Sequence, residues 1–299
     1  MITGQIPNHL IVGARTGFLQ AVAKPNMAWQ RVAQVVTLDA AAVDLVDLGA
    51  APMPTEQTGR SITQEFIEKH LEVKSKPWEI VIGISHNAVN DSKANDLVRK
   101  AQAAGENFQK HMNARVFKVL NGGDGTTYGL AYDGQEFFDS DHVDEGAKYQ
   151  TAQDNEFALA LSLDNFNTVN VAAQKTKDDQ GENTNFLYNT LVVPPDLEYV
   201  ASQITANFEA YDTASRERNP FSGKVEYVVS PEIDSTAWML IAGSESVKPL
   251  LLVMREQPNL QSAWFAPREG SEGGIYYFKF YARYDVVYGD WRLAYQGNT

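Results

Sequence analysis

The sequence contains no cysteine. Disulfide bonds, catalytic thiolates and cysteine-ligated metal sites are therefore excluded. Long apolar runs are also missing, because none reaches the roughly 18 residues that a membrane-spanning helix requires. The first residues, MITGQIPNHLIVGARTG, show no basic region followed by a long apolar one. We therefore expect neither a membrane span nor a secretory signal.

Positive charge is scarce. The 299 residues include 25 Lys and Arg against 38 Asp and Glu, which gives a formal net charge of −13. Such a chain is poorly suited to bind nucleic acid tightly, because tight binding needs many Lys and Arg side chains to replace the counterions of the phosphates. It can still enclose nucleic acid, and the simplest effect of the charge is solubility through mutual repulsion. With 43% hydrophobic residues, the composition indicates a globular protein with a sizeable core.

Common catalytic and phosphate-binding motifs are absent as well. Gly223 and Lys224 are followed by Val225 and lack the upstream glycine of a P-loop, and neither G-x-S-x-G nor HExxH occurs. The GGDG at 122–125 follows a predicted helix instead of leading into one, which favours a helix end over an anion site. The histidines are scattered along the chain: His9, His70, His86, His111 and His142.

A strand followed by a long helix is the clearest structural signal. WEIVIGIS, at 78–85, places its apolar residues alternately on one face. From about 91 to 121 the apolar positions recur every three or four residues, as in a helix with one buried stripe. Such a helix is on the order of 45 Å long, whereas the average protein helix has about 11–12 residues. The stripe consists of Leu97, Ala101, Ala104, Phe108, Met112, Val116 and Val119.

The second half of the chain alternates helices and strands. One helix is predicted to begin at Ser162 or Asp164, and another follows Pro194 and Pro195. The predicted strands are 189–193, 225–230, 249–256 and 275–288. Gly289–Asp290 then predicts a tight hairpin turn that returns the chain beside the 275–288 strand.

Two N-terminal segments have too few large apolar residues to fold alone. Residues 1–35 show little periodicity and indicate an arm that needs a surface to lie on. Residues 36–77 predict two strand-like flanks around a Pro- and Gly-rich tip at 49–59. An isolated pair of strands is only marginally stable in water, so we expect the 36–77 segment to pack against a neighbour.

The acidic loop YDGQEFFDSDH, at 132–142, concentrates groups that can bind a metal or transfer protons: Asp133, Glu136, Asp139, Asp141 and His142. Carboxylates can bind a hard cation such as Ca²⁺, but the residue order of an EF-hand loop is missing. A catalytic pair of carboxylates would need a pocket and unequal environments. We favour a structural interpretation, with a turn at Asp133–Gly134, Phe137–Phe138 anchored in a core, and the acids directed to water.

The order of these elements resembles the major capsid fold of tailed phages, which is named after phage Hong Kong 97. Three stretches resemble Mu-like major head proteins: KPWEIVIGISHNAVNDS, YDGQEFFDSDH, and the run from LSLDNFNTVN to VVPPDLEYVASQI. The resemblance covers most of the chain from about 62 to 299, and residues 1–61 match by arrangement only. Val143 stands where the family usually has a proline after the histidine.

The resemblance implies an α+β, Hong Kong 97-like phage capsid fold. Its parts would be an N-terminal arm (1–35), an E-loop on a neighbouring subunit (36–77), a P-domain (78–186) with a spine helix at about 91–121, most of an A-domain (187–272), and C-terminal strands of the P-domain (273–299).

The resemblance also implies a structural role, with no catalytic, cofactor-binding or metal-binding residues. The subunit would form hexamers and pentamers of an icosahedral head that encloses double-stranded genomic DNA without reading its sequence. A portal protein would occupy one vertex, and scaffold, protease and decoration proteins are further candidate partners, with no membrane involved. Its location would be the virion, after assembly in the bacterial cytoplasm.

Alternatives stay open at this point. An encapsulin-like compartment would use the same fold to hold enzymes, and a metal-dependent enzyme centred on 132–142 would need ligands from elsewhere in the chain. Some relatives of this fold join subunits through a Lys–Asn cross-link. Lys69, Lys74 and Lys76 lie in the 36–77 segment, but they have no assignable partner, so we expect no cross-link.

Overall fold

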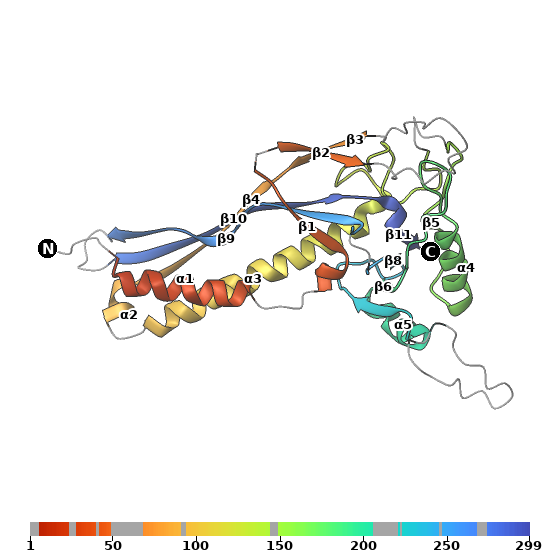
Figure 1. The fold of residues 1–299 in the computed structure, drawn as a ribbon. Helices are drawn as coiled ribbons and strands as arrows, with labels where there is room; N and C mark the ends of the chain where they lie inside the picture. Colours follow the sequence, from red (N-terminus) through yellow and green to blue (C-terminus); the bar gives the residue numbers. More distant parts are fainter. Residues whose placement is uncertain are drawn as a thin grey trace, which may run out of the picture.

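The computed structural model describes residues 6–23, 28–39, 42–48, 68–90, 94–143, 149–205, 221, 223–244, 247–267 and 274–299. They form an elongated molecule with a long sheet and two helices towards one end and a smaller α/β unit at the other (Figure 1). The helices are α1 (Asn8–Val22), α2 (His86–Asn90), α3 (Ala94–Asn121), α4 (Leu163–Gln174) and α5 (Glu198–Thr205), with 3₁₀ turns η1 (Ala28–Arg31), η2 (Gly122–Asp124), η3 (Pro195–Leu197) and η4 (Trp291–Leu293). The strands are β1 (Ala33–Thr37), β2 (Ala42–Leu48), β3 (Glu68–Lys74), β4 (Lys76–Ser85), β5 (Glu156–Phe157), β6 (Thr190–Val193), β7 (Glu226–Val229), β8 (Trp238–Ile241), β9 (Leu250–Pro267), β10 (Gly274–Tyr288) and β11 (Ala294–Gly297).

The long helix α3 runs beneath the long sheet and has 28 residues. All seven residues of its predicted apolar stripe are buried, which confirms the helical spacing. The glycines after Asn121 form the turn η2, so the GGDG does end a helix. The predicted start, at about residue 91, lies outside the described residues.

The long sheet has the strand order β1-β9-β10-β4. β1 is parallel to β9, and the other neighbours are antiparallel. The predicted alternation of β10 is confirmed, because one face of the strand is buried against α1 and α3: Tyr276, Phe278, Phe280, Ala282 and Tyr284. β9 extends well beyond the predicted 249–256, and it pairs with β10 along nearly its whole length.

Residues 8–22 form the helix α1, although the sequence indicated an arm without periodicity. α1 lies along α3 in the same chain (Figure 1), and its residues Leu10, Ala14 and Phe18 are buried there. The two helices approach closely at Gly105, where an added Cβ would lie 2.7 Å from the Phe18 carbonyl oxygen. Small residues make this contact, and their low hydrophobicity gives the sequence pattern of α1 little periodicity.

The second sheet has the strand order β5-β11-β8-β6-β7 and is flanked by α4 and α5. Strand β8 had not been predicted. The predicted hairpin at Gly289–Asp290 is wrong, because β11 pairs with β8 and β5 instead of β10. The Asp290 side chain accepts a hydrogen bond from the Arg292 backbone N–H at 3.0 Å, which starts the turn η4 and redirects the chain.

The predicted helix after Ser162 is confirmed as α4. The Ser162 hydroxyl accepts a hydrogen bond from the Asn165 N–H at 3.2 Å, and this caps the helix. Phe166, Val169 and Ala173 are fully buried against the second sheet, as expected. The helix after Pro195 is α5, which buries Ala201 and Ile204 in the same core.

The two strand-like parts of the 36–77 segment form hydrogen bonds with each other, as β2 and β3. β2 and β3 are antiparallel, with Ala42 opposite Lys74 and Leu48 opposite Glu68. The base of this pair contacts the long sheet through a small cluster of Leu38, Val73 and Val253. The predicted tip, at 49–59, lies outside the described residues. No helix in the described part of the chain is long and apolar enough to cross a bilayer.

Candidate functional site

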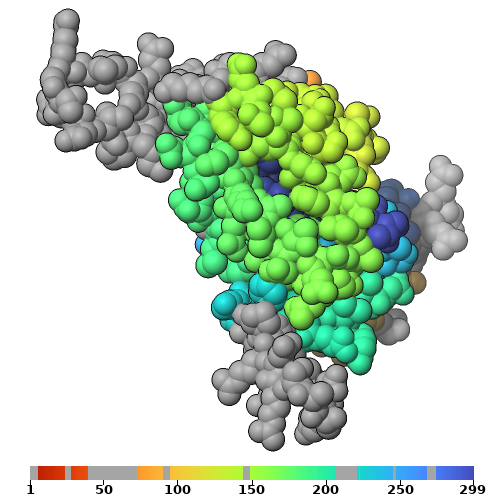
Figure 2. Space-filling view, turned by 90° about the vertical axis from the view of Figure 1, so that its right-hand side faces the viewer, coloured from red at the N-terminus to blue at the C-terminus, as the bar shows by residue number. Residues whose placement is uncertain are grey.

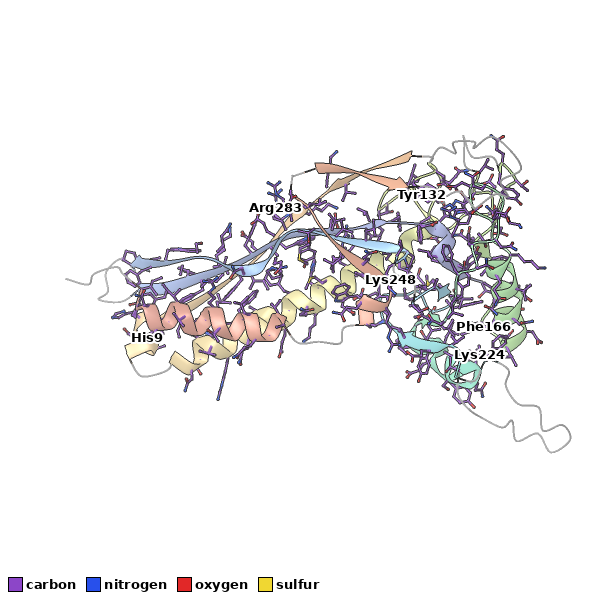
Figure 3. All side chains as sticks on the ribbon, viewed as in Figure 1. His9, Tyr132, Phe166, Lys224, Lys248 and Arg283 are labelled. Atoms are coloured by element: carbon purple, nitrogen blue, oxygen red, sulfur yellow. The ribbon has the colours of Figure 1, made fainter. Side chains whose placement is uncertain are left out.

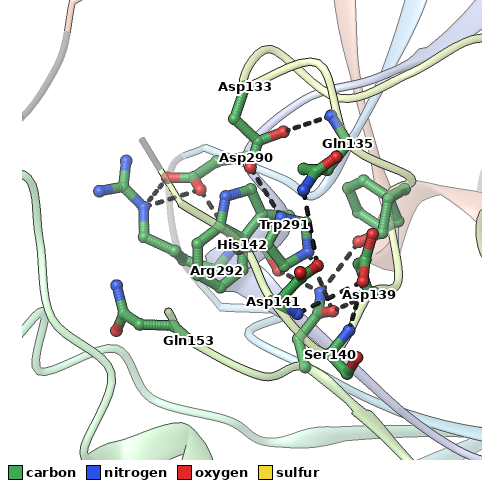
Figure 4. A network of polar contacts seen from close by, with 12 residues as sticks. Asp133, Gln135, Asp139, Ser140, Asp141, His142, Gln153, Asp290, Trp291 and Arg292 are labelled. Carbon is green, nitrogen blue, oxygen red and sulfur yellow. Dashed lines mark hydrogen bonds and ion pairs between the residues drawn. The ribbon is translucent and has the colours of Figure 1, made fainter. Parts of the chain in front are cut away.

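Three segments meet in a buried junction between the two sheets. They are the loop 131–143, the segment 153–157 and the turn 290–296 (Figure 4). Figure 2 looks onto this end of the molecule, where residues in yellow and green surround a hollow with dark blue C-terminal residues at its floor. The predicted acidic loop is therefore packed onto the end of the chain.

The loop begins with the predicted turn. Gly134 has a φ of +84°, a left-handed conformation that glycine adopts without strain, and its N–H donates to the Ala131 carbonyl at 3.1 Å. Phe137 and Phe138 are fully buried, and the Phe137 ring stacks on Tyr288 at a centroid distance of 4.7 Å. The turn and the aromatic anchor are thus confirmed.

Asp133 does not point to water, so that part of the prediction is wrong. Its side chain is 1% exposed, and its Oδ2 lies 2.7 Å from Nδ1 of His142, whose side chain has no exposed surface. The other oxygen of Asp133 accepts a hydrogen bond from the Gln135 N–H at 3.2 Å. The carboxylate can be buried because both of its oxygens have partners.

The remaining acids of the loop lie nearer the surface. Glu136 is half-buried. The Asp139 carboxylate accepts hydrogen bonds from the backbone N–H groups of Ser140 at 2.6 Å and Asp141 at 3.3 Å, so it shapes the loop. Asp141 is exposed, and a hydrogen bond and repulsion from Asp139 raise its pKa.

Asn155 is the central polar residue of the junction. Its Nδ2 group donates to the carbonyl oxygens of Phe137 at 2.9 Å, Ala294 at 3.1 Å and Trp291 at 3.4 Å. Its Oδ1 accepts from the Asp139 N–H at 2.9 Å and lies 3.1 Å from Nε2 of His142. Sequence reasoning missed Asn155, because a lone asparagine outside a motif carries no local signal.

Trp291 and Arg292 complete the junction. The rings of His142 and Trp291 stack at a centroid distance of 4.0 Å with an interplanar angle of 3°. Arg292 forms ion pairs with Asp179 at 2.7 Å and Asp290 at 2.9 Å. Burial opposes the charge of Arg292, but these carboxylates outweigh it and hold its pKa above the usual value. The charges are therefore paired internally.

Negative charge gathers beside the junction. Burial, followed by repulsion from Asp124 and Asp139, raises the pKa of Glu156. Burial also raises the pKa of Asp154. No group of three or more His, Asp or Glu side chains in the described ranges could hold a metal ion.

The other histidines lie apart from the junction. His9 is exposed at the start of α1 (Figure 3), and His70 lies in β3. His86 and His111 each hydrogen-bond a tyrosine of β10, Tyr276 and Tyr284, at 2.9 and 2.7 Å. His111 is thus locally bonded, and its flanking position on α3 needs no catalytic explanation.

Comparisons with known proteins agree with this structural character. A family model described as Mu-like prophage major head subunit gpT matches residues 8–158 and 149–233. Curated protein sequences contain no match. The family match favours a phage head subunit over an encapsulin-like compartment or an enzyme.

Solved capsid structures share the fold. A chain of the procapsid of bacteriophage JBD30 is 20% identical with a TM-score of 0.58, covering 98% of this chain and 74% of that one. A chain of the JBD30 capsid decorated with minor capsid protein trimers is 19% identical with a TM-score of 0.53, covering 77% and 100%. A chain of the virus-like particle from Pyrococcus furiosus is 13% identical with a TM-score of 0.54, covering 95% and 97%.

The predicted Hong Kong 97-like fold is therefore confirmed, with its long helix and mixed sheets. A family model that matches more than half of the chain also identifies the role of the protein, whose location is the virion. The chain belongs to the Mu-like prophage major head subunit gpT family, and it is a structural subunit of a phage capsid, not an enzyme.

Proposed function

We propose that copies of this subunit form the hexamers and pentamers of an icosahedral head around double-stranded DNA. The observation that carries the proposal is one face of the long sheet whose described residues include exposed apolar side chains, and we call it the open face. It consists of the residues of β4, β9 and β10 that alternate with those buried on α1 and α3. Near Val253 and Val287, this side of the sheet packs against Leu38 and Val73.

The open face combines exposed apolar groups with satisfied ion pairs. Trp264 is 42% exposed and stacks on its cross-strand neighbour Tyr277 at 5.3 Å. Val81, two residue pairs further along, is 44% exposed. Lys279 pairs with Glu79 at 2.6 Å on the same face. An apolar centre beside paired charges is typical of a surface that a protein partner covers.

The regions of the subunit would then have the roles that the capsid fold assigns to them. Residues 1–35 would be the N-terminal arm and 36–77 the E-loop on a neighbouring subunit. Residues 78–186, with α3 as the spine, would be the P-domain, and most of 187–272 the A-domain. We assign β9 to the P-domain sheet, together with the strand in 273–299, because β9 pairs with β10.

Further partners belong to this proposal. The net charge of −13 supports a shell that encloses DNA without binding it tightly. A portal protein would close one vertex, and scaffold, protease or decoration proteins would act during assembly. A chain similar to this one comes from a capsid decorated with minor capsid protein trimers. We expect no cross-link, so denatured particles should run as single subunits on a gel.

Substitution of Trp264 tests the role of the open face. Trp264→Ser should lower the unfolding midpoint of the subunit only modestly, because Trp264 is 42% exposed and contributes one ring contact with Tyr277, but it should abolish particles in electron micrographs. Trp264→Tyr keeps an aromatic ring on Tyr277 and should restore assembly. If Trp264→Ser subunits assemble into particles as well as the unchanged protein does, the open face is not an assembly surface.

A further inference from the structure

Ser75 is the single residue between β3 and β4, although these two strands belong to different sheets. β3 pairs with β2, whereas β4 pairs with β10 of the long sheet. In Figure 1 the β2–β3 pair lies above the long sheet, on the side opposite α1 and α3. The contacts on either side of Ser75 therefore help to set the direction in which the pair leaves the sheet.

We propose that Asp285 is a positioning residue that fixes this direction. Together with Arg115 of α3 and Lys76 of β4 it forms what we call the base clamp. The base clamp holds β2–β3 at one angle to the long sheet. Every subunit must share this angle if the pair is to reach a neighbour in a closed shell. This consequence rests on the proposed function, whereas the base clamp itself is a property of the single subunit.

The Asp285 carboxylate binds a cation with each of its oxygens. Oδ1 accepts a hydrogen bond from Nε of Arg115 at 3.0 Å, and Nη2 of the same guanidinium lies 2.9 Å away. Oδ2 lies 2.7 Å from Nζ of Lys76. The Asp285 side chain is only 7% exposed, and these two partners compensate its desolvation. The carboxylate thus links α3 to the first residue of β4.

Arg115 is itself held in place, so the base clamp is anchored in the body of the subunit. Its side chain is 16% exposed, and its guanidinium lies over the Tyr128 ring at 4.8 Å. One turn earlier in α3, Nδ1 of His111 lies 2.7 Å from the Tyr284 hydroxyl. These contacts hold α3 against β10 next to Asp285.

A second attachment lies on the cross-strand neighbour of Asp285. Asp285 is opposite Val253 in the register of β9 and β10, so the two side chains share one face of the sheet. Val253 is fully buried in a small apolar cluster with Val73 of β3. Val73 and Lys76, which lie on either side of Ser75, are therefore bound to adjacent positions of one face.

The backbone around Ser75 narrows where the angle can change. Pro77 follows Lys76, and a residue before proline is largely confined to extended backbone. Lys76 begins β4 in this conformation. Among the described residues, none hydrogen-bonds the buried hydroxyl of Ser75. The contacts on either side of Ser75, and not its own side chain, thus fix the angle.

The length of β3 makes a small contact important. β3 has seven residues, which at about 3.3 Å each give an arm of about 23 Å. A rotation of about 10° at Ser75 therefore moves the far end of β3 by about 4 Å. The apolar cluster at the base has three buried residues, and contacts of this kind have no preferred direction. The ion pair of Lys76 is directional and opposes the rotation.

Distances between spin labels test the base clamp in the full-length protein. Because the chain has no cysteine, Glu68→Cys in β3 and Asn107→Cys on the exposed side of α3 provide two unique labelling sites. Diluting labelled protein into unlabelled protein ensures that pairs within one subunit dominate, in free subunits and in particles. Lys76→Met should broaden the distribution of label distances. Lys76→Arg keeps a cation beside Asp285 and should restore the narrow distribution.

Lys118→Met is the matched control. Lys118 is 54% exposed and pairs with Glu232 at 3.3 Å, whereas Lys76 is 57% exposed. Exposed lysines contribute little to stability, so both variants should remain folded, but Lys118→Met should leave the label distances unchanged. The base clamp is refuted if Lys76→Met gives the same width as the unchanged protein, or if both methionine variants broaden the distribution equally.

Electron microscopy tests the consequence for assembly. Particles of Lys76→Met should vary in diameter or fail to close, while those of Lys76→Arg and Lys118→Met should match the particles of the unchanged protein. Uniform closed particles from Lys76→Met, despite broadened label distances, would overturn the role of the base clamp in assembly. Absence of particles from the unchanged protein would instead contradict the proposed function, and the spin-label result would still decide whether the base clamp exists.

Discussion

Asn121 and Asp234 bind each other through two hydrogen bonds. Asn121 Nδ2 donates to Asp234 Oδ2 at 3.0 Å, and the Asp234 backbone N–H donates to Asn121 Oδ1 at 2.9 Å. Asn121 is the last residue of α3, whereas Asp234 precedes β8 of the second sheet. The contact therefore ties the long helix α3 to the second sheet of the subunit.

The two partners should differ in their effect on stability. Asn121→Ala removes both hydrogen bonds and should lower the free energy of unfolding by about 1–2 kcal/mol. Asp234→Ala keeps its backbone N–H and should lower it by only about 0.5–1 kcal/mol. Guanidinium denaturation of the two variants measures the difference. Equal losses of unfolding free energy in the two variants would show that the hydrogen bond from the Asp234 backbone N–H contributes nothing to stability.

Phe137 should be the most costly residue of the acidic loop to truncate. It is fully buried between Phe138 and Tyr288, so Phe137→Ala should lower the free energy of unfolding by about 3–5 kcal/mol. Leu130→Ala is the control from the same connection, because Leu130 is 42% exposed and should change stability by less than about 0.5 kcal/mol. Denaturation curves that give the two variants the same free energy of unfolding would refute the anchoring role of Phe137.

Gly105 should resist even the smallest side chain. A Cβ there would lie 2.7 Å from the Phe18 carbonyl oxygen and 2.8 Å from the Ala21 Cβ. Gly105→Ala should therefore destabilise the protein by about 1–3 kcal/mol through overpacking, despite the higher helix propensity of alanine. Hydrogen exchange should accelerate in α1. Gly125→Ala, where a Cβ would meet nothing within 4 Å, is the control and should leave α1 protected.

Glu156→Gln should stabilise the protein near neutral pH. Burial and neighbouring carboxylates raise the pKa of Glu156, so the folded state disfavours its charge. The stabilising contribution of the protonated form is present at low pH and is lost as the pH rises through the folded-state pKa. Removing the charge should thus raise the Tm at pH 7 but hardly at pH 4. A Tm increase of the same size at both values would exclude this electrostatic cause.

Local patterns predicted the elements that repeat regularly. The three-and-four spacing of α3, the alternation of β10 and the Ser162 cap depend on neighbours in sequence, so they could be recognised without a structure. The Phe137–Phe138 anchor could also be predicted, because two adjacent phenylalanines in a polar loop have few favourable places outside a core. Motif order led to the capsid fold.

Strand partners and buried polar contacts could not be predicted in this way. The alternation of β10 is compatible with a hairpin beyond Gly289, but Asp290 starts η4 and β11 pairs with β8. The helix α1 escaped prediction because its contact surface consists partly of glycine and alanine. The pairing partner of β11 and the packing of α1 depend on which surfaces meet in the folded chain. The free energy of each possible arrangement is therefore set by residues far away in sequence.

The sequence by itself therefore determined the long helix, the alternating strands, the aromatic anchor and the family. Only the tertiary structure decided that Asp133 is buried, because a carboxylate leaves water only where partners compensate its desolvation. Those partners, His142 and through it Asn155 and Trp291, come from three segments that no local pattern connects.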